Sequence, residues 1–154
     1  DHVEPVVAAI HAEGGEVLKF MGDGILAVFP ADDRHAAAER ALAAAAAARQ
    51  GLGDLARMRE GADLPSTGLY LALHVGSVFY GNVGGPDRLD FTVVGPAVNE
   101  VARIAAMCRS VDRSLLLSQA FVDALDGADQ QVASVGRFAL RGVEVVQHLY
   151  TPDA

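Results

Sequence analysis

The stretch GGEVLKFMGDGILAVFP, residues 14–30, carries two apolar runs, Val17–Met21 and Ile25–Phe29, on either side of a Gly-Asp-Gly tripeptide. An Asp-Gly step between two such runs predicts a β-hairpin, because glycine accepts the positive φ of a tight turn. Asp23 would lie at the hairpin tip and Lys19 in the first strand. This pair suits a metal–nucleotide site, although on these residues alone a solvated aspartate and a surface lysine are the simpler interpretation.

Length and composition indicate one globular domain. The chain has 154 residues, of which 51% are apolar and 21% charged, enough for one domain with a real core and too few for two ordinary ones. Twelve Lys and Arg against twenty Asp and Glu give a net charge of −8, so we expect no nucleic-acid partner. A polyphosphate ligand would need divalent metal and a few placed cations. The single cysteine, Cys108, excludes an internal disulfide and fits a reducing, cytoplasmic compartment.

The first residues of the chain do not resemble a signal peptide. The chain does not begin with methionine, and a helical pattern (Val3, Val6, Val7, Ile10) begins at once. No apolar run approaches the length of a membrane span, so we expect no membrane contact by this domain. We therefore expect this chain to be a piece of a longer protein that carries regulatory domains. Whether that longer protein is tethered to a membrane stays open.

Turn residues and hydrophobic periodicity predict helices and hairpins in alternation, in an α+β sandwich with helices packed on a mostly antiparallel sheet. Beyond the first hairpin, Gly51, Gly53, Gly61 and Pro65 predict only a short helical piece and a loop over 50–66. The expected helices cover 3–13, the run from the Asp32 and Asp33 cap to Gln50, about 97–109, and 119–125. The expected strands cover 68–76, 77–83, 91–94, 114–117, 132–140 and 145–150.

The helix after Pro96 carries a second informative pair. Asn99 and Arg103 are four residues apart and share a face beside an apolar stripe. An amide and a guanidinium on one face could hold a ribose and a phosphate, since the arginine fork suits phosphate oxygens. The alternative is a solvated face with an ordinary Glu100–Arg103 pair.

Three segments resemble the catalytic domain of class III nucleotidyl cyclases, the adenylate and guanylate cyclases. They are GGEVLKFMGDGILAVF, LALHVGSVFYGNVGG and FTVVGPAVNEVARI, in that order, and the closing FALRGVEVVQHLY resembles the last hairpin of the family. The resemblance covers nearly the whole chain, 1–154. It implies a ferredoxin-like α+β fold that works as a head-to-tail homodimer with active sites at the interface. The family's first strand, with the first of two metal-binding aspartates, lies upstream of residue 1, so this fragment alone is expected to be inactive or nearly so.

The resemblance also implies roles for five residues. Asp23 matches the second metal-binding aspartate, and Lys19 matches the lysine that reads the purine. Thr92 falls where many members carry the base-specifying aspartate, and a Lys/Thr pair resembles the subgroup of adenylate cyclases that includes bicarbonate-responsive members. Asn99 resembles the residue that orients the ribose, and Arg103 resembles the one that stabilises charge on the reacting phosphate. In the family, metal ligands come from one subunit, and the base-reading, Asn and Arg residues from the other.

The implied activity is conversion of ATP to 3′,5′-cyclic AMP and pyrophosphate, with two Mg²⁺ or Mn²⁺ ions per site. Two alternatives stay open. A threonine hydroxyl both accepts and donates, so discrimination against GTP is softer than with a carboxylate, and the chain could be a guanylate cyclase. It could also be a catalytically inactive module that serves dimerisation or nucleotide sensing.

Other polar residues have structural interpretations. His74 lies in an apolar strand and is expected to be a packed core histidine. Ser118 is expected to cap a helix, because no partnered base is visible in the sequence. Arg141 aligns only loosely with a family lysine at the terminal phosphates and is expected to be structural.

Overall fold

The computed structural model describes residues 3–21, 24–30, 32–61, 69–82, 91–126 and 132–152. The chain divides into two compact units, Asp1–Leu69 and Tyr70–Ala154. The single catalytic domain expected over 1–154 stays a prediction.

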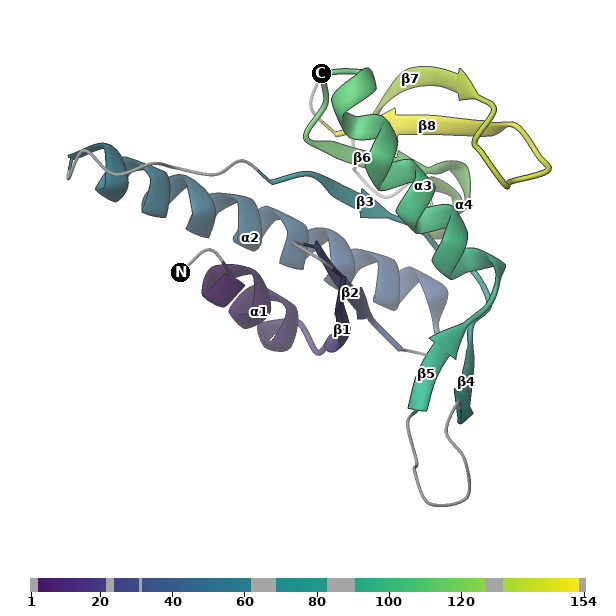
Figure 1. The fold of residues 1–154 in the computed structure, drawn as a ribbon, viewed down its shortest axis with the longest axis horizontal. Helices are drawn as coiled ribbons and strands as arrows, with labels where there is room; N and C mark the ends of the chain where they lie inside the picture. The colour runs from purple at the N-terminus through teal and green to yellow at the C-terminus, as the bar shows by residue number, and fades with distance from the viewer. Residues whose placement is uncertain are drawn as a thin grey trace. The chain divides into compact units, whose positions relative to one another are not determined.

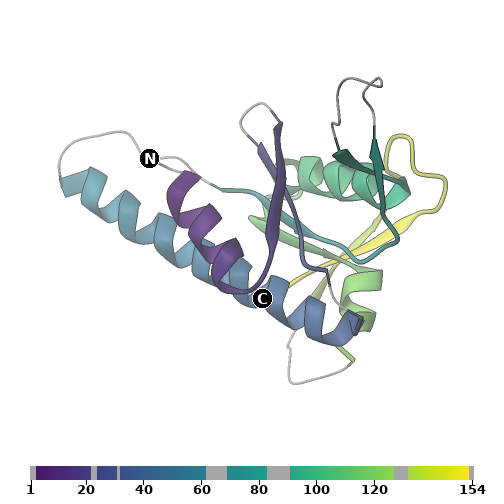
Figure 2. The ribbon, with the colours of Figure 1, turned by 90° about the horizontal axis from the view of Figure 1, so that it is seen from below.

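The first unit pairs two helices with a hairpin. Its elements are α1 (Val3–Ala12), β1 (Glu16–Met21), β2 (Gly24–Val28) and α2 (Arg34–Gly61), and Figure 2 shows α1 lying beside α2. Gly14, with φ of 81°, follows α1, and β1 pairs antiparallel with β2. Asp33 caps α2, since its Oδ1 accepts a 3.0 Å hydrogen bond from the His35 N–H. The predicted first helix, hairpin and cap are confirmed, while the hairpin tip at 22–23 lies outside the described residues.

The core of the first unit explains the alanine-rich helix. Ala9 and Ile10 of α1 are buried with Ala48 and Leu52 of α2, and apolar side chains of the hairpin pack against them. Alanine has the highest helix propensity and lets two helices approach closely. The alanine run is therefore a packing surface.

Helix α2 is longer than the sequence predicts. It continues through Gly51 and Gly53 as far as Gly61, although each interior glycine costs about 1 kcal/mol relative to alanine. Leu52, only 9% exposed, packs in the core between them. A Cβ atom at Gly51 would lie 3.0 Å from the Pro5 Cβ, so α1 passes close to the helix there. Tertiary packing offsets the glycine cost, and the prediction of a break after residue 50 is wrong.

The second unit is built on a four-stranded sheet. Strand order is β3-β6-β8-β7, with β3 parallel to β6 and the other neighbours antiparallel, and β4 and β5 form a separate antiparallel pair. Figure 1 shows α3 lying across this sheet. The elements are β3 (Leu71–Leu73), β4 (Phe79–Asn82), β5 (Phe91–Val94), α3 (Pro96–Ser110), β6 (Leu115–Ser118), α4 (Gln119–Ala124), β7 (Ala133–Phe138) and β8 (Gln147–Thr151).

Strand β6 runs through the core of this unit. All four of its residues are buried, because β6 has neighbours on both edges and contacts α3 and α4. Leu116 packs with Ile104 and Cys108 of α3 and with Leu149 of β8. The predicted α+β class, with helices packed on a mostly antiparallel sheet, is confirmed.

Several strand predictions are too long, including those over 77–83 and 132–140, where the strands are Phe79–Asn82 and Ala133–Phe138. The strand expected over 68–76 is only β3, three residues. The last strand begins at Gln147, and Val145 and Val146 before it are 70% and 54% exposed. Gly142, with φ of 79°, turns the chain in the wider connection from β7. Among the helices of the described residues, none combines the length and apolar character that crossing a membrane requires.

Candidate functional site

Helix α3 presents Asn99 and Arg103 to solvent. Both residues are exposed, while Ile104 and Cys108 of the same helix are fully buried against the sheet. Residues four apart share one helix face, so the amide and the guanidinium lie on a common exposed surface. Within the described part of the chain, neither side chain has a hydrogen-bond or ion-pair partner. Both are therefore available to a ligand.

The turn between β7 and β8 lies beside this face. A Cβ atom at Gly142 would be 3.5 Å from Asn99 Nδ2. Arg141, the preceding residue, is exposed. The second unit thus brings the turn that follows Arg141 next to the amide of Asn99, a neighbourhood that the sequence alone did not predict.

The other predicted residues lie in different places. Thr92 belongs to β5 and pairs with Gly81 of β4. Its side chain lies outside the described residues. The same strand leads into α3 through Gly95, whose φ is 139°. Lys19 is exposed on β1 in the first unit, and Asp23 lies outside the described residues.

A buried histidine connects α3 to the sheet. His74 Nε2 lies 2.7 Å from Glu100 Oε2 of α3, and the His74 side chain is only 6% exposed. His74 Nδ1 lies 2.7 Å from Ser118 Oγ, which also accepts a 3.1 Å hydrogen bond from the Phe121 N–H. These bonds define one arrangement for the neutral ring, in which Nε2–H donates to Glu100 and Nδ1 accepts from the Ser118 hydroxyl. The predicted packed histidine is confirmed, and Glu100 pairs with it instead of with Arg103.

Burial lowers the pKa of His74 below its ordinary value of 6.5, and the neighbouring Glu100 carboxylate opposes this shift without overcoming it. The folded protein therefore holds His74 neutral at pH values where the unfolded chain protonates it. Because the unfolded state then binds more protons, stability falls as pH drops below about 6.5.

We expect His74→Gln to reduce this acid sensitivity. The variant lacks a titrating ring, so urea unfolding at pH 7.5 and pH 5.5 should differ less than in the wild type. At pH 7.5 it should be less stable by about 1–3 kcal/mol, because glutamine cannot reproduce both bonds and leaves a buried partner unpaired. An unchanged difference between the two pH values would show that other groups cause the acid sensitivity.

Ser118 is hydrogen-bonded to a base, His74, which the sequence alone did not reveal. Leu73 pairs with Leu117 in the parallel β3–β6 register, so the next residues, His74 and Ser118, end up side by side. A Ser–His–carboxylate chain would suit nucleophilic catalysis, but Ser118 is 0% exposed and its Oγ caps α4. No substrate can reach it, and the predicted cap role is confirmed.

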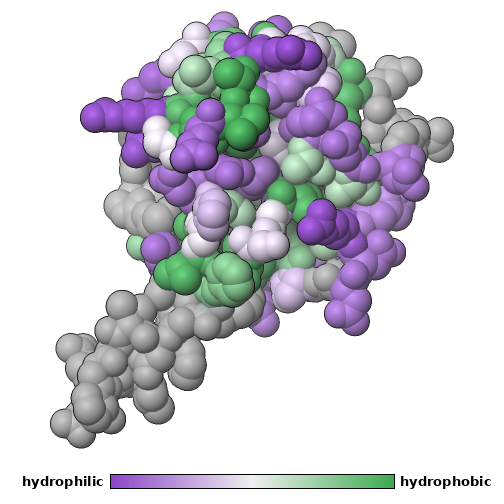
Figure 3. Space-filling view, turned by 90° about the vertical axis from the view of Figure 1, so that its right-hand side faces the viewer, coloured by the Kyte–Doolittle hydropathy of each residue, from purple (hydrophilic) through white to green (hydrophobic). Residues whose placement is uncertain are grey.

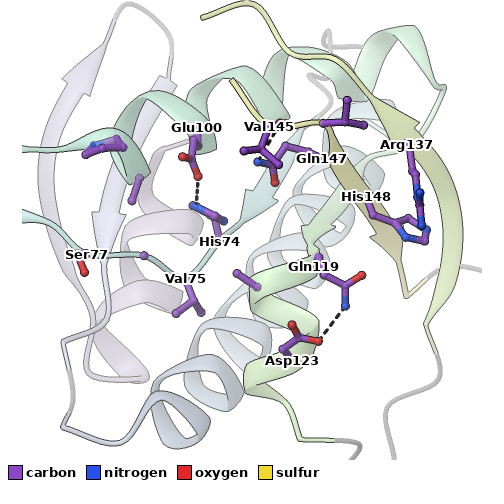
Figure 4. A pocket seen from close by; sticks show the side chains of 15 residues that line it. His74, Val75, Ser77, Glu100, Gln119, Asp123, Arg137, Val145, Gln147 and His148 are labelled. Carbon is purple, nitrogen blue, oxygen red and sulfur yellow. Dashed lines mark hydrogen bonds and ion pairs between the residues drawn. The ribbon is translucent and has the colours of Figure 1, made fainter. Parts of the chain in front are cut away.

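A cavity of about 680 Å³ opens beside this histidine. Figure 4 shows His74 and Glu100 at one side of it, and Gln119 and Asp123 of α4 at another. Arg137 and His148 line it from the last two strands. Neither Asn99 nor Arg103 is among the lining residues, so this cavity and the exposed α3 face are separate features.

Among the described residues, no group of three or more His, Cys, Asp or Glu side chains is placed to hold a metal ion. The predicted metal ligand, Asp23, lies outside them. Cys108 is buried, and burial raises the pKa of its thiol, which makes it a core residue with little thiolate character.

Comparison with known sequences finds relatives without an assigned activity. No protein-family model matches the chain. An uncharacterized protein of Mycobacterium tuberculosis is 34% identical over 149 residues, which is 96% of this chain and 26% of the relative. A second uncharacterized protein, from Mycobacterium bovis, is 32% identical over 148 residues, again 96% of this chain and 26% of the relative. The chain thus spans about a quarter of the curated relatives it matches.

Comparison with solved structures identifies the fold. A bacterial light-regulated adenylyl cyclase is 27% identical, with a TM-score of 0.78 over 97% of this chain and 42% of that one. The adenylyl cyclase CyaB from P. aeruginosa has a TM-score of 0.80 at 19% identity, over 97% of this chain and 76% of that one. The guanylyl cyclase Cya2 has a TM-score of 0.75 at 24% identity, over 97% and 75%.

The chain therefore has the class III cyclase fold, and the predicted ferredoxin-like α+β architecture is confirmed. Its structural neighbours include both adenylyl and guanylyl cyclases. This similarity supports a cyclase-type domain. It does not distinguish an adenylyl cyclase from a guanylyl cyclase.

Proposed function

We propose that this chain is the catalytic domain of an adenylate cyclase, which converts ATP to 3′,5′-cyclic AMP and pyrophosphate at a homodimer interface. The observation that carries the proposal is the exposed pair Asn99 and Arg103 on α3 of a cyclase fold, two side chains without a hydrogen-bond or ion-pair partner among the residues that the structure describes. Because the two side chains lie four residues apart on one exposed helix face, an amide and a guanidinium can meet the same ligand there.

The proposed reaction is attack of the ribose 3′-hydroxyl on the α-phosphorus of ATP. The new O–P bond closes the cyclic ester as the bond to pyrophosphate breaks, and the proton of the hydroxyl is released to solvent. Asn99 would orient the ribose so that the hydroxyl faces the phosphorus. Arg103 would donate hydrogen bonds to the phosphoryl oxygens, where negative charge develops in the transition state. Both roles need side chains free to meet a ligand, as the exposed face of α3 provides.

We propose that Asp23 is one of the ligands of the divalent metal ions. A carboxylate oxygen is a ligand that Mg²⁺ and Mn²⁺ favour. One aspartate does not make a two-ion site, and the described residues add no ligand cluster, so the remaining ligands would come from elsewhere in the full-length protein. When bound, two divalent ions activate the attacking hydroxyl and neutralise the leaving group.

Base recognition would fall to Lys19 and Thr92. The threonine hydroxyl can accept a hydrogen bond from the exocyclic amine of adenine, which favours ATP and the Lys/Thr subgroup of adenylate cyclases. Lys19 is exposed on β1, where its ammonium is accessible to a ligand. We propose that the two residues act on a base held by the dimer.

Exposed apolar side chains of the second unit support the dimer. Phe79 and Val94 face each other in the β4–β5 register and are 63% and 47% exposed. Figure 3 shows hydrophobic patches among hydrophilic residues on one face of the molecule. Val145 and Val146, in the final hairpin, are exposed as well. Apolar groups gathered at a surface are typical of protein–protein contacts, and a second copy is the partner that a two-fold enzyme needs.

The test is an assay of the full-length protein with ATP and with GTP in the presence of Mn²⁺. We expect cyclic AMP as the main product. A clear preference for GTP would make the protein a guanylate cyclase, and no cyclic nucleotide from either substrate would leave the dimerisation or nucleotide-sensing module as the better account.

A further inference from the structure

The first turn of α3 rests on the chain segment that follows β3. The N-cap residue of the helix is Gly95, which offers no side-chain hydrogen bond, and the first helical residue is Pro96. A Cβ atom at Gly76 would lie 2.6 Å from the Ala97 Cβ, and one at Gly95 would lie 3.1 Å from the Ser77 carbonyl oxygen. The segment 74–77 and the start of α3 are therefore in direct contact.

One charge-assisted bond joins the same two elements. Glu100 directly follows Asn99, and its carboxylate lies 2.7 Å from His74 Nε2. The other ring nitrogen is bonded to Ser118, a fully buried residue at the junction of β6 and α4. Figure 4 shows Glu100 pointing from the helix toward His74. The carboxylate is thus connected through the ring to β6, whose four residues are all buried.

We propose that His74 and Glu100 are positioning residues, which fix the first turns of α3 so that Asn99 faces the Arg141–Gly142 turn and the nucleotide. This inference rests on the proposed function, because it concerns the placement of a residue assigned to substrate. Neither His74 nor Glu100 is assigned contact with the nucleotide. Their effect passes through the backbone of α3, in which Asn99 and Glu100 are neighbours.

Loss of the pair should affect turnover more than binding. The Gly76–Ala97 contact would still hold the helix near the sheet, but its first turns would be free to tilt. A displacement of about 1 Å at a reacting centre can cost up to about 10²-fold in rate. We expect kcat for ATP to fall about tenfold in His74→Ala and in Glu100→Ala, with a change in KM of about threefold or less.

A double-mutant cycle in the full-length protein tests whether the two residues act as one. If they do, His74→Ala/Glu100→Ala should lose no more kcat than the worse single variant. Glu100→Gln keeps an oxygen that accepts from Nε2–H, and it should retain about half or more of the wild-type kcat. His148→Ala is the matched control, because His148 is also bonded to a serine, Ser134, but belongs to β8; its kcat should be unchanged.

Additive losses in the double variant would overturn the proposal, as would wild-type kcat in both single variants. A loss in Glu100→Gln as large as in Glu100→Ala would overturn it as well, since the hydrogen bond would then not be the cause. Thermal unfolding of each variant identifies any that fail to fold. Where the alanine variants do not fold, a kcat of Glu100→Gln well below about half of the wild-type value would overturn the proposal.

Hydrogen exchange separates this proposal from the proposed function. In His74→Ala, backbone amides near Asn99 should exchange about tenfold faster, with the rest of the unit unchanged. Unchanged exchange there would overturn the positioning role whether or not the protein makes cyclic nucleotide. Faster exchange in a protein that makes none would instead reject the proposed function and leave the role of the pair in placing α3.

Discussion

Replacement of Arg103 by alanine in the full-length protein should lower kcat for cyclic AMP formation by about 10²–10³-fold, the loss typical when one preorganised donor to a developing oxyanion is removed. Arg103 is exposed on α3, and its guanidinium has no ion-pair partner within the described residues. The substitution therefore breaks no ion pair of the described fold. Product formation is measured at saturating ATP and Mn²⁺, with thermal unfolding as the check on folding.

The matched control is Arg109→Ala on the same helix. The Arg109 guanidinium lies 5.7 Å from the ring centroid of Tyr70, so its loss should cost about 0.5–1 kcal/mol of stability and leave kcat unchanged. Arg103→Lys should recover little, since lysine keeps the charge but lacks the planar fork. An Arg103→Ala variant with more than about a tenth of the wild-type kcat would contradict the assigned role.

Local sequence patterns predict the elements whose physical cause is local. The Gly-Asp-Gly step with flanking apolar runs predicts the first hairpin, and the two runs do pair antiparallel, because turn chemistry acts over a few residues. Ser118 caps α4 for a similar reason, since its Oγ needs only the N–H of Phe121, three residues on. The Asn99 and Arg103 pair shares a helix face by geometry alone.

Features that depend on tertiary contacts could not be predicted in this way. Helix α2 passes through Gly51 and Gly53 because α1 packs there, and propensity alone argues for a break. The His74–Ser118 bond joins residues 44 apart in the sequence. It follows from the parallel register of β3 and β6, which no local pattern reveals.

The site residues also divide into those that sequence patterns predict and contacts that only the fold creates. Sequence resemblance assigns five residues, and the structure describes where Lys19, Asn99 and Arg103 lie, as well as the strand of Thr92. The nearness of the Arg141–Gly142 turn to Asn99 depends on how the β7–β8 connection folds back toward α3. That contact joins two parts of the chain separated by β6, α4 and β7, so only the folded unit reveals it.

A mixture of two inactive variants should recover activity if the site is shared between subunits. Asp23→Ala and Arg103→Ala should each be nearly inactive alone, since one lacks the proposed metal ligand and the other the proposed donor to the phosphate. In the proposed head-to-tail homodimer, Asp23 of one subunit works with Arg103 of its partner. Random pairing makes about half of the dimers mixed, each with one intact site, so the mixture should show about a quarter of wild-type activity.

The companion mixture, Asn99→Ala with Arg103→Ala, should stay inactive. Both residues lie on α3 of one subunit, so every site in a mixed dimer lacks either the amide or the guanidinium. Recovery in the first mixture alone therefore reports the division of the site between two chains, and not merely stabilisation by a partner. Recovery in neither, with dimers present by size-exclusion chromatography and light scattering, would place Asp23 and Arg103 in the same half-site and contradict the proposed geometry.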